Sequence, residues 1–425
     1  MATDVNVQYF SHLNGLALGN NWGGLIRLLD KTLVTGIDFT QITAASIDEQ
    51  GDVHITLYAA HNAMLFQVVE LTGFTPTSLN QKYRIKGVPS TTELILKPHT
   101  AISETSVTIV GSGKLAPLGY DIIFRDANDV KRVYRAKNPT AQHPFIRIDE
   151  SLTSPDGTTG VYSNTYNLFA MVGLLERMDH IDDFEDPSVQ QLPFDPTTPA
   201  KNWNIVGTGG SVIRGWSRWY YASRGDVNYV YADTGVPISG LRPFTLVGDS
   251  DSFLINRNTI STLGAKAIIG CGLFRSTLED IAPSWFLASC LNASAASTSR
   301  SLSTDTGGRS VWGYNGGYNT QSVFMLKLGQ TQPAAHVIAV PILPDNRTGY
   351  SGIYNGTEFS ALEVPVVDQN KVLRGVLPHT LYLGANFSAM TQTYPYSSGS
   401  SMYVIDSVQT DSPIGSTAFY LGELE

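Results

Sequence analysis

The stretch Asp52–Leu57, which reads DVHITL, indicates the fold class. Apolar Val53, Ile55 and Leu57 alternate with polar side chains, and this period of two is typical of a β-strand with one buried face. Similar short segments follow, separated by residues that favour turns: LFQVVEL (65–71), KYRIKGV (82–88), TELILKP (92–98) and SVTIVGSG (106–113). This spacing predicts a small β-sandwich or barrel over residues 46–113. The alternative is that the segment forms part of one larger β domain.

One segment before this module has the apolar pattern of a helix. Its apolar side chains recur at spacings that place them on one helical face: Leu25, Ile26, Leu28, Leu29 and Leu33. We therefore expect an N-terminal arm and a helix within residues 1–45, with the helix running from about Asn21 to Leu33. Gly36 follows as a residue type that commonly ends a helix.

The rest of the chain, residues 114–425, also consists largely of short apolar segments separated by turns. Examples are APLGYDIIF (116–124), FTLVGDSDSFLI (244–255) and AKAIIGCGLF (265–274). The segment NLFAMVGLLERM (167–178) instead has a helical apolar rhythm, with a buried strand as the alternative. The sequence thus predicts a mainly β protein: a small N-terminal β-sandwich or barrel module and a larger β-rich body with a few short helices.

The composition excludes several classes of protein. Hydrophobic residues make up 42% of the 425 residues and charged residues only 15%, whereas disordered chains are rich in charge. The formal net charge is −9 and no block of Lys and Arg is present, so we expect no sequence-specific nucleic-acid binding. No apolar run approaches the ~20 residues of a membrane span, and no secretory leader is recognisable. We expect synthesis in a reducing cytoplasm, with Cys271 and Cys290 as free thiols.

One tripeptide has the letters of a catalytic motif. Gly248-Asp249-Ser250 resembles the nucleophile block of GDSL-type esterases, in which a histidine held by a carboxylate activates the serine. Those enzymes place the block near the start of the chain and an Asp-x-x-His motif near the end; here the block is central and that motif is absent. We interpret the tripeptide as a hairpin turn. No phosphate-binding loop, dinucleotide fingerprint or zinc spacing is present, so the sequence predicts no enzymatic activity and no cofactor.

An acidic stretch, DHIDDFED at residues 179–186, offers carboxylate oxygens of the kind that bind Ca²⁺ or Mg²⁺. It lacks the glycine spacing of an EF-hand loop. We expect a charged, solvated loop without a metal. Asp182, Asp183 and Asp186 are the candidate ligands for the alternative, in which a cation binds.

Aromatic side chains are concentrated in two short segments with few charges. Trp and Tyr dominate the energetics of protein–protein interfaces, so both segments are predicted to contact another subunit. The alternatives are that they form part of the core or that they stack on sugar rings. The candidate interface residues are Trp216, Trp219, Tyr220 and Tyr221 in the first segment and Trp312, Tyr314 and Tyr318 in the second.

Several segments occur in a distinctive order along the chain: LIRLLDKTLVTG (25–36), FTPTSLNQKYRIKGV (74–88), KLAPLGYDIIF (114–124), FIRIDES (145–151), MVGLLERMDHIDDF (171–184), LVGDSDSFLI (246–255) and LRGVLPHTLYL (373–383). In this order they resemble a largely uncharacterised family of tail-associated virion proteins from tailed bacteriophages and prophages. The resemblance implies a non-enzymatic building block and assigns no functional residues. Relative to that family the chain carries added material around 185–240 and 290–335, which we expect to be loop insertions.

Three classes of function follow from this resemblance. The first is a tail, baseplate or head-to-tail component that forms a symmetric homo-oligomer and binds other phage virion proteins. The second is a capsid decoration or head-fibre protein. The third is a receptor-binding or glycan-binding tail protein; a glycan-cleaving tailspike would have sequence repeats and paired catalytic carboxylates, which this sequence lacks. We expect the first class, with the protein made in the bacterial host cytoplasm and located in the virion.

Overall fold

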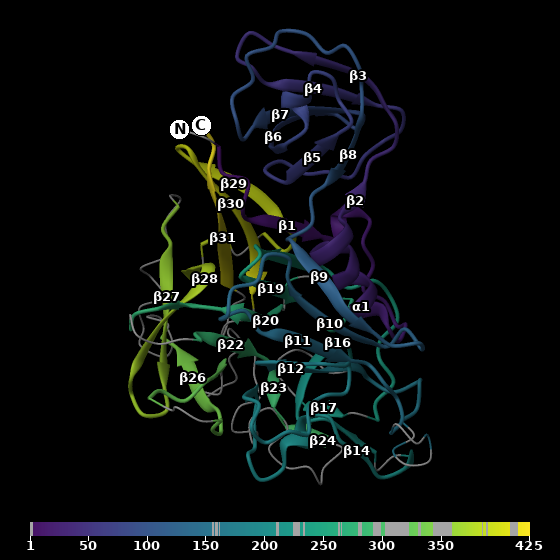
Figure 1. The fold of residues 1–425 in the computed structure, drawn as a ribbon, viewed down its shortest axis with the longest axis vertical. Coiled ribbons are helices and arrows are strands. Elements are labelled where there is room, and N and C mark those ends of the chain that lie inside the picture. Colours follow the sequence, from purple (N-terminus) through teal and green to yellow (C-terminus); the bar gives the residue numbers. More distant parts are fainter. Residues whose placement is uncertain are drawn as a thin grey trace.

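A computed structural model of the chain confirms the mainly β fold class, with several antiparallel sheets and one α-helix in the described part. A small module lies above a larger body, and the two chain ends meet beside the junction between them (Figure 1). The structure describes residues 3–154, 157, 160, 162–209, 212–223, 230–232, 234–261, 264, 266–278, 283–291, 299–301, 323–329, 333–342, 359–384, 386–387, 390–408 and 415–425.

The small module is a seven-stranded sheet that begins at Ile37 and ends at Leu115, so it extends beyond the predicted segment 46–113 on both sides. Strand β4 (Val53–Leu57) has the predicted alternation, with Val53, Ile55 and Leu57 buried. The strand order is β2 (Ile37–Asp38), β8 (Ser112–Leu115), β5 (Val68–Thr72), β6 (Lys82–Ser90), β7 (Glu93–Pro98), β4 (Val53–Leu57) and β3 (Ile42–Ile47).

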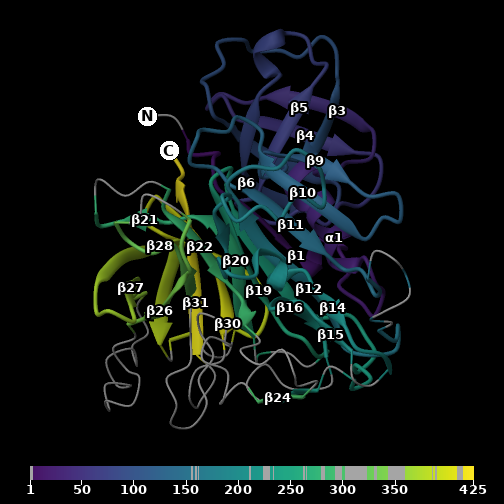
Figure 2. The ribbon, with the colours of Figure 1, turned by 60° about the horizontal axis from the view of Figure 1, so that its bottom comes forward.

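The body contains two large sheets, which lie side by side in Figure 2. One has the order β23 (Cys290–Leu291), β16 (Ser217–Ala222), β12 (Leu168–Leu175), β11 (Phe145–Asp149), β10 (Lys131–Ala136) and β9 (Tyr120–Arg125), with β13 (Gln191–Leu192) beside β12. Two short two-stranded sheets accompany it: β14 (Ile205–Val206) with β15 (Ile213–Arg214), and β17 (Val230–Ala232) with β24 (Ser299–Ser301).

The other large sheet has thirteen strands and joins both ends of the chain. Its first strand pairs with a strand more than 230 residues later, in the register Gln8 to Gly248. The order is β1 (Gln8–Ser11), β18 (Phe244–Gly248), β19 (Ser252–Arg257), β20 (Ala267–Leu273), β22 (Trp285–Ala288), β25 (Val323–Met325), β26 (Val337–Pro341), β27 (Leu362–Asp368), β28 (Leu373–Gly384), β31 (Gly415–Glu423), β30 (Ser401–Val408) and β29 (Tyr394–Ser398), with β21 (Arg275–Ser276) beside β28.

The predicted early helix is present. Helix α1 (Gly24–Leu29) continues as one π-helical segment, η2 (Asp30–Thr35), and its apolar face is buried. Gly36 ends it with a φ of 76°, and a Cβ at this position would collide with Leu115 O, so only glycine fits. No helix in the described part of the chain is long and apolar enough to cross a membrane. The other short helical turns are η1 (His12–Asn14), η3 (Thr77–Leu79) and η4 (Pro199–Asn202).

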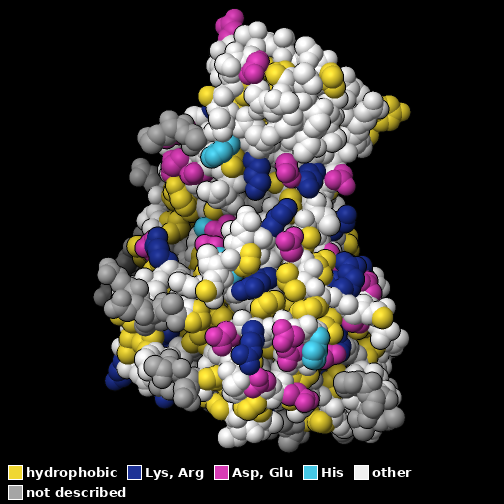
Figure 3. Space-filling model, in the orientation of Figure 1, with side chains coloured by type: hydrophobic (Ala, Val, Ile, Leu, Met, Phe, Trp, Pro, Cys, Tyr) yellow, Lys and Arg dark blue, Asp and Glu magenta, His cyan; other side chains and the backbone are white. Residues whose placement is uncertain are grey.

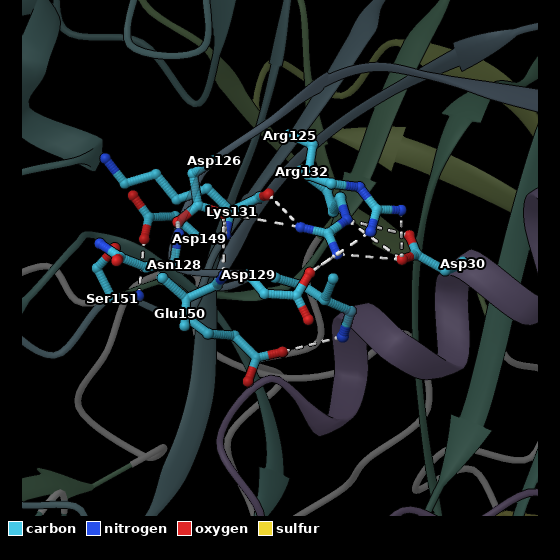
Figure 4. Close-up of polar contacts among 12 residues, drawn as sticks. Asp30, Arg125, Asp126, Asn128, Asp129, Lys131, Arg132, Asp149, Glu150 and Ser151 are labelled. Carbon is cyan, nitrogen blue, oxygen red and sulfur yellow. Dashed lines mark hydrogen bonds and ion pairs between the residues drawn. The ribbon is translucent and has the colours of Figure 1, made fainter.

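Charged side chains fasten this helix to the second sheet (Figure 4). Glu150, directly after β11, accepts hydrogen bonds from the backbone nitrogens of Gly23 (2.5 Å) and Ile26 (3.0 Å), which have no partner within the helix. Burial raises the pKa of Glu150. Arg132 on β10 pairs with Asp30 at 3.2 Å, one residue after α1. Both ends of α1 are therefore bonded by side chains that lie on or directly after strands of one sheet.

The module and the body share one hydrophobic core. A single cluster of buried residues includes Leu71 of the module, Leu29 of α1 and Leu246 of the thirteen-stranded sheet. Arg84 of the module also crosses the junction, because its guanidinium donates to Asp4 O at 2.8 Å and to Leu421 O at 3.1 Å. The module is thus bonded to residues near both chain ends.

The segment 167–178 contains strand β12 (Leu168–Leu175), so the predicted helix there is wrong. All eight residues of β12 are buried, and the strand pairs with β11 on one side and β16 on the other. A strand that is covered on both faces carries a continuous apolar run, which periodicity alone does not separate from a helix. The segments predicted as loop insertions, 185–240 and 290–335, also supply strands to the large sheets, including β16 and β25.

Candidate functional site

Three of the predicted interface aromatics are core residues. Trp219, Tyr220 and Tyr221 lie on β16, every residue of which is buried, and each has at most 1% of its surface exposed. Trp219 Nε1 donates a hydrogen bond to Ala288 O at 2.9 Å, and its ring meets the Phe253 ring edge-on. The prediction that these three side chains contact another subunit is therefore wrong, because the chain itself covers both faces of their strand.

Trp216, just before β16, is the half-buried member of the group. Its ring lies under Lys201, whose Nζ is 4.3 Å from the ring centroid, and against the imidazole of His336 at 5.0 Å. Burial lowers the pKa of His336 to about 4, and the nearby Lys201 ammonium acts in the same direction. A subunit contact through Trp216 stays a prediction. The second segment, with Trp312, Tyr314 and Tyr318, lies outside the described residues.

The acidic stretch is an ion-paired loop. Acidic and basic side chains lie side by side on the face of the body that Figure 3 shows. Asp182 is 2.9 Å from Lys131 Nζ and 2.5 Å from Arg147 Nη2. Burial would raise the pKa of Asp182, but these two cations hold it below its usual range. Asp186 pairs with an arginine, and Asp183 accepts a backbone N–H. Within the described ranges, no group of three or more His, Cys, Asp or Glu side chains is placed to hold a metal ion.

The tripeptide Gly248-Asp249-Ser250 lies in the turn between β18 and β19, as predicted. Two histidines bond the acidic side chains of this turn. Asp249 is 2.9 Å from Nε2 of His379, and Asp251 is 2.9 Å from Nε2 of His143. Burial would raise the pKa of Asp249, but its hydrogen bond and charge interaction with His379 keep it below the usual value. In the described structure both imidazoles bond carboxylates of the turn, and neither is hydrogen-bonded to the Ser250 hydroxyl.

A cavity of about 420 Å³ opens next to this turn. Asp249 and His379 line it, together with Arg275, Tyr403 and Tyr420. Arg275 forms an ion pair with Glu363, another lining residue. Paired charges beside tyrosine rings suit a small polar ligand such as a sugar, which stacks on aromatic faces and accepts hydrogen bonds.

Among the described residues of the body, the two most exposed large hydrophobic side chains lie on a loop that the sequence analysis did not single out. This apolar loop, residues 234–241 (TGVPISGL), connects β17 to β18. Val236 and Leu241 are 62% and 63% exposed, and Ile238 between them is also exposed. Three large aliphatic side chains held in water on one short loop are typical of a protein contact surface.

The residue that follows the apolar loop fixes its backbone. Arg242 is fully buried, and its guanidinium donates to Thr259 O at 2.6 Å, to Gly240 O at 3.2 Å and to Ile238 O. Burial lowers the pKa of Arg242 to about 10, so the group is still charged at neutral pH. The loop therefore presents its aliphatic side chains from a backbone whose carbonyls at 238 and 240 are hydrogen-bonded to a buried cation.

The candidate site includes features that sequence reasoning missed. The apolar loop has a local signal, because large aliphatic residues stand between Gly235, Pro237 and Gly240 where turn residues are expected. No local sequence signal marks the two histidines, since His143 and His379 are each more than 100 residues from the carboxylates that they bond. No protein-family model matches the chain, and a search of curated proteins gives no match.

Proposed function

We propose that the chain is a non-enzymatic structural component of a tailed-bacteriophage virion, in the tail, baseplate or head-to-tail region. In this proposal it acts by assembling with copies of itself and with other virion proteins. The observation that carries the proposal is the apolar loop, residues 234–241, which exposes Val236, Ile238 and Leu241 on a fixed backbone. The resemblance of the ordered sequence segments to tail-associated proteins supports the choice of particle.

Energetics favour this loop as a docking element. Full burial of one Val or Leu side chain contributes roughly 1.5–3 kcal/mol. Ordering a flexible loop on binding would consume part of that gain, and Arg242 has already ordered this one within the free chain. The loop can therefore contribute most of its apolar burial to association with a partner.

A second candidate function is glycan binding by a tail protein, which the cavity beside β19 favours. Tyr403 and Tyr420 provide ring surfaces, and Asp249 and Arg275 provide hydrogen-bonding groups around the same space. A capsid decoration or head-fibre protein would use the apolar loop in the same way as a tail component. Imaging of particles that carry a label on this chain separates those two positions.

The experiment for the main proposal is the double substitution Val236→Ser and Leu241→Ser. We expect self-association, measured by sedimentation velocity, to weaken at least about tenfold. We also expect fewer copies of the chain in purified particles. The fold should be retained in near-ultraviolet circular dichroism, because both side chains lie in water in the free chain.

The matched control is Leu362→Ser, which removes an exposed leucine from β27. This variant should associate and enter particles like the parent chain. Unchanged association together with unchanged incorporation of the double variant would overturn the proposal. A glycan array with the unmodified chain tests the second candidate separately, and binding lost in Tyr403→Ala would support it.

A further inference from the structure

A lysine and an aspartate are buried together inside the thirteen-stranded sheet. Lys266 stands directly before β20, and Asp406 lies on β30. Both side chains have no exposed surface, and Lys266 Nζ is 2.5 Å from Asp406 Oδ1. No other Lys–carboxylate pair among the described residues is buried at both ends.

A chain of hydroxyl groups leads from this pair toward the surface. Thr245 Oγ1 donates to Asp406 Oδ2 at 2.7 Å and lies 2.6 Å from Thr393 Oγ1. Thr393 Oγ1 is 2.7 Å from Ser11 Oγ, which in turn is 3.3 Å from Nδ1 of His12. His12 is half-buried, and burial lowers its pKa, so its ring is neutral at neutral pH. The carboxyl group is thus connected through hydroxyls to a group that accepts protons.

An ion pair in this position contributes little to stability. Moving two charges out of water costs several kcal/mol per ion, and the attraction between them often does no more than offset that cost. Well-packed apolar side chains of similar volume are commonly as stable or more stable. Full burial of Lys266 and Asp406 is therefore no sign that the ion pair stabilises the fold, and a chemical role is the alternative.

The geometry also brings the reacting atoms together. Because a carboxyl C–O bond is about 1.2 Å long, Nζ at 2.5 Å from Oδ1 lies no more than about 3.7 Å from the carboxyl carbon. That upper limit is close to the ~3–3.5 Å of near-attack conformers, in which reactants held in place react faster than free reactants do. Water is excluded, which favours loss of water over hydrolysis of the product.

We propose that Lys266 and Asp406 condense to an intramolecular amide bond. One ammonium proton passes from Nζ to the carboxylate, which gives a neutral amine and a carboxylic acid. Nζ then attacks Cγ and forms the C–N bond, the C–O bond to one carboxyl oxygen breaks, and a second proton from Nζ joins the departing hydroxyl to form water. Thr245 polarises the carboxyl group through Oδ2, and the hydroxyl chain to His12 relays protons. No oxidant and no co-reactant is needed.

Such a bond would join strands that lie far apart in the sheet order. Residues 266 and 406 enclose most of the C-terminal half of the chain, including β20 through β29. A covalent link across this span limits the freedom of the unfolded chain, as a disulfide does. The inference is independent of the proposed role in a virion.

The test is the intact mass of the purified full chain after folding at neutral pH. We expect a mass lower than the sequence mass by one water molecule, and a protease digest in which a peptide containing Lys266 is joined to one containing Asp406. Lys266→Arg keeps the charge but offers no condensing amine, and Asp406→Ala removes the carboxyl group. Both variants should have their full sequence mass.

Lys86→Arg is the matched control, since Lys86 Nζ also lies 2.5 Å from an aspartate, Asp52, but the Lys86 side chain is 41% exposed to water. The control should still lose one water. An unmodified wild-type mass would overturn the proposal, and so would a loss of water that maps to any other pair. If the Lys266 and Asp406 variants do not fold, the wild-type mass and its peptide map decide the question alone.

Discussion

Strand β16 and the apolar loop are two apolar segments of similar length with opposite environments. β16 contains Trp219, Tyr220 and Tyr221 and is fully buried, whereas the apolar loop at 234–241 has three exposed aliphatic side chains. Residue type alone would favour β16 over the loop as a binding surface, because aromatic residues are those most enriched in interfaces. Exposure depends on the neighbours: β16 has a strand on each side, and the loop has a buried arginine beneath it.

The difference teaches that an aromatic run is an ambiguous sign of a binding surface. Trp and Tyr bury large areas equally well in a core and in an interface, provided that their polar atoms find partners. Trp219 has such a partner within the chain, at Ala288 O. Exposed aliphatic residues on a fixed loop are the stronger sign, since the free chain gains nothing from holding them in water.

The largest loss of stability is expected from Trp219→Ala, which tests whether β16 belongs to the core. Removal of the fully buried indole leaves a cavity and removes the hydrogen bond to Ala288 O, so the free energy of unfolding should fall by about 3–5 kcal/mol. Urea denaturation followed by circular dichroism measures the change. Tyr58→Ala, at a side chain that is 77% exposed, is the control and should change little. A Trp219 variant of normal stability that fails to assemble would restore the interface interpretation.

A smaller loss of stability is expected when the pH is lowered, because His336, which packs against Trp216 just before β16, then becomes protonated on unfolding. The pKa of His336 is about 4 in the folded chain and about 6.5 when the chain is unfolded. The unfolded chain therefore binds more protons between these values, and stability present above pH 6.5 is lost as the pH falls toward 4. The loss is at most about 3 kcal/mol, less solvent screening of the half-buried ring.

Urea midpoints at several pH values measure this loss. His336→Gln removes the titrating group and should flatten the stability curve between pH 6.5 and 4, relative to the parent chain. Equal slopes in the variant and the parent chain would show that His336 is not the group responsible.

The smallest effect on stability is expected from Leu241→Ser alone. The side chain is 63% exposed, so the free energy of unfolding should change by less than about 0.5 kcal/mol. Urea denaturation of the isolated chain is again the measurement. A large loss of stability would mean that the loop belongs to the fold, and it would remove the contrast with β16.

Local alternation was enough to predict strands such as β4, and the helical spacing of apolar residues was enough to predict the helix before them. It failed at β12, where burial of both faces erases the alternation that marks a half-buried strand. The turn at Gly248–Ser250 was predictable from its residue types, but the histidines that bond it were not, because long-range pairing leaves no local pattern. Lys266 and Asp406 are likewise 140 residues apart.

The pairing of β1 with β18 has a consequence for protein synthesis. A ribosome must add about 230 further residues after Ser11 before the partner residue Thr245 exists. At roughly 5–20 residues per second, this takes on the order of 10–50 s. The interval is longer still for Asp4, whose backbone N–H donates a hydrogen bond to Glu423 O at 3.0 Å. Tyr9 and Phe10, which are fully buried in the finished protein, are open to cellular chaperones throughout that interval.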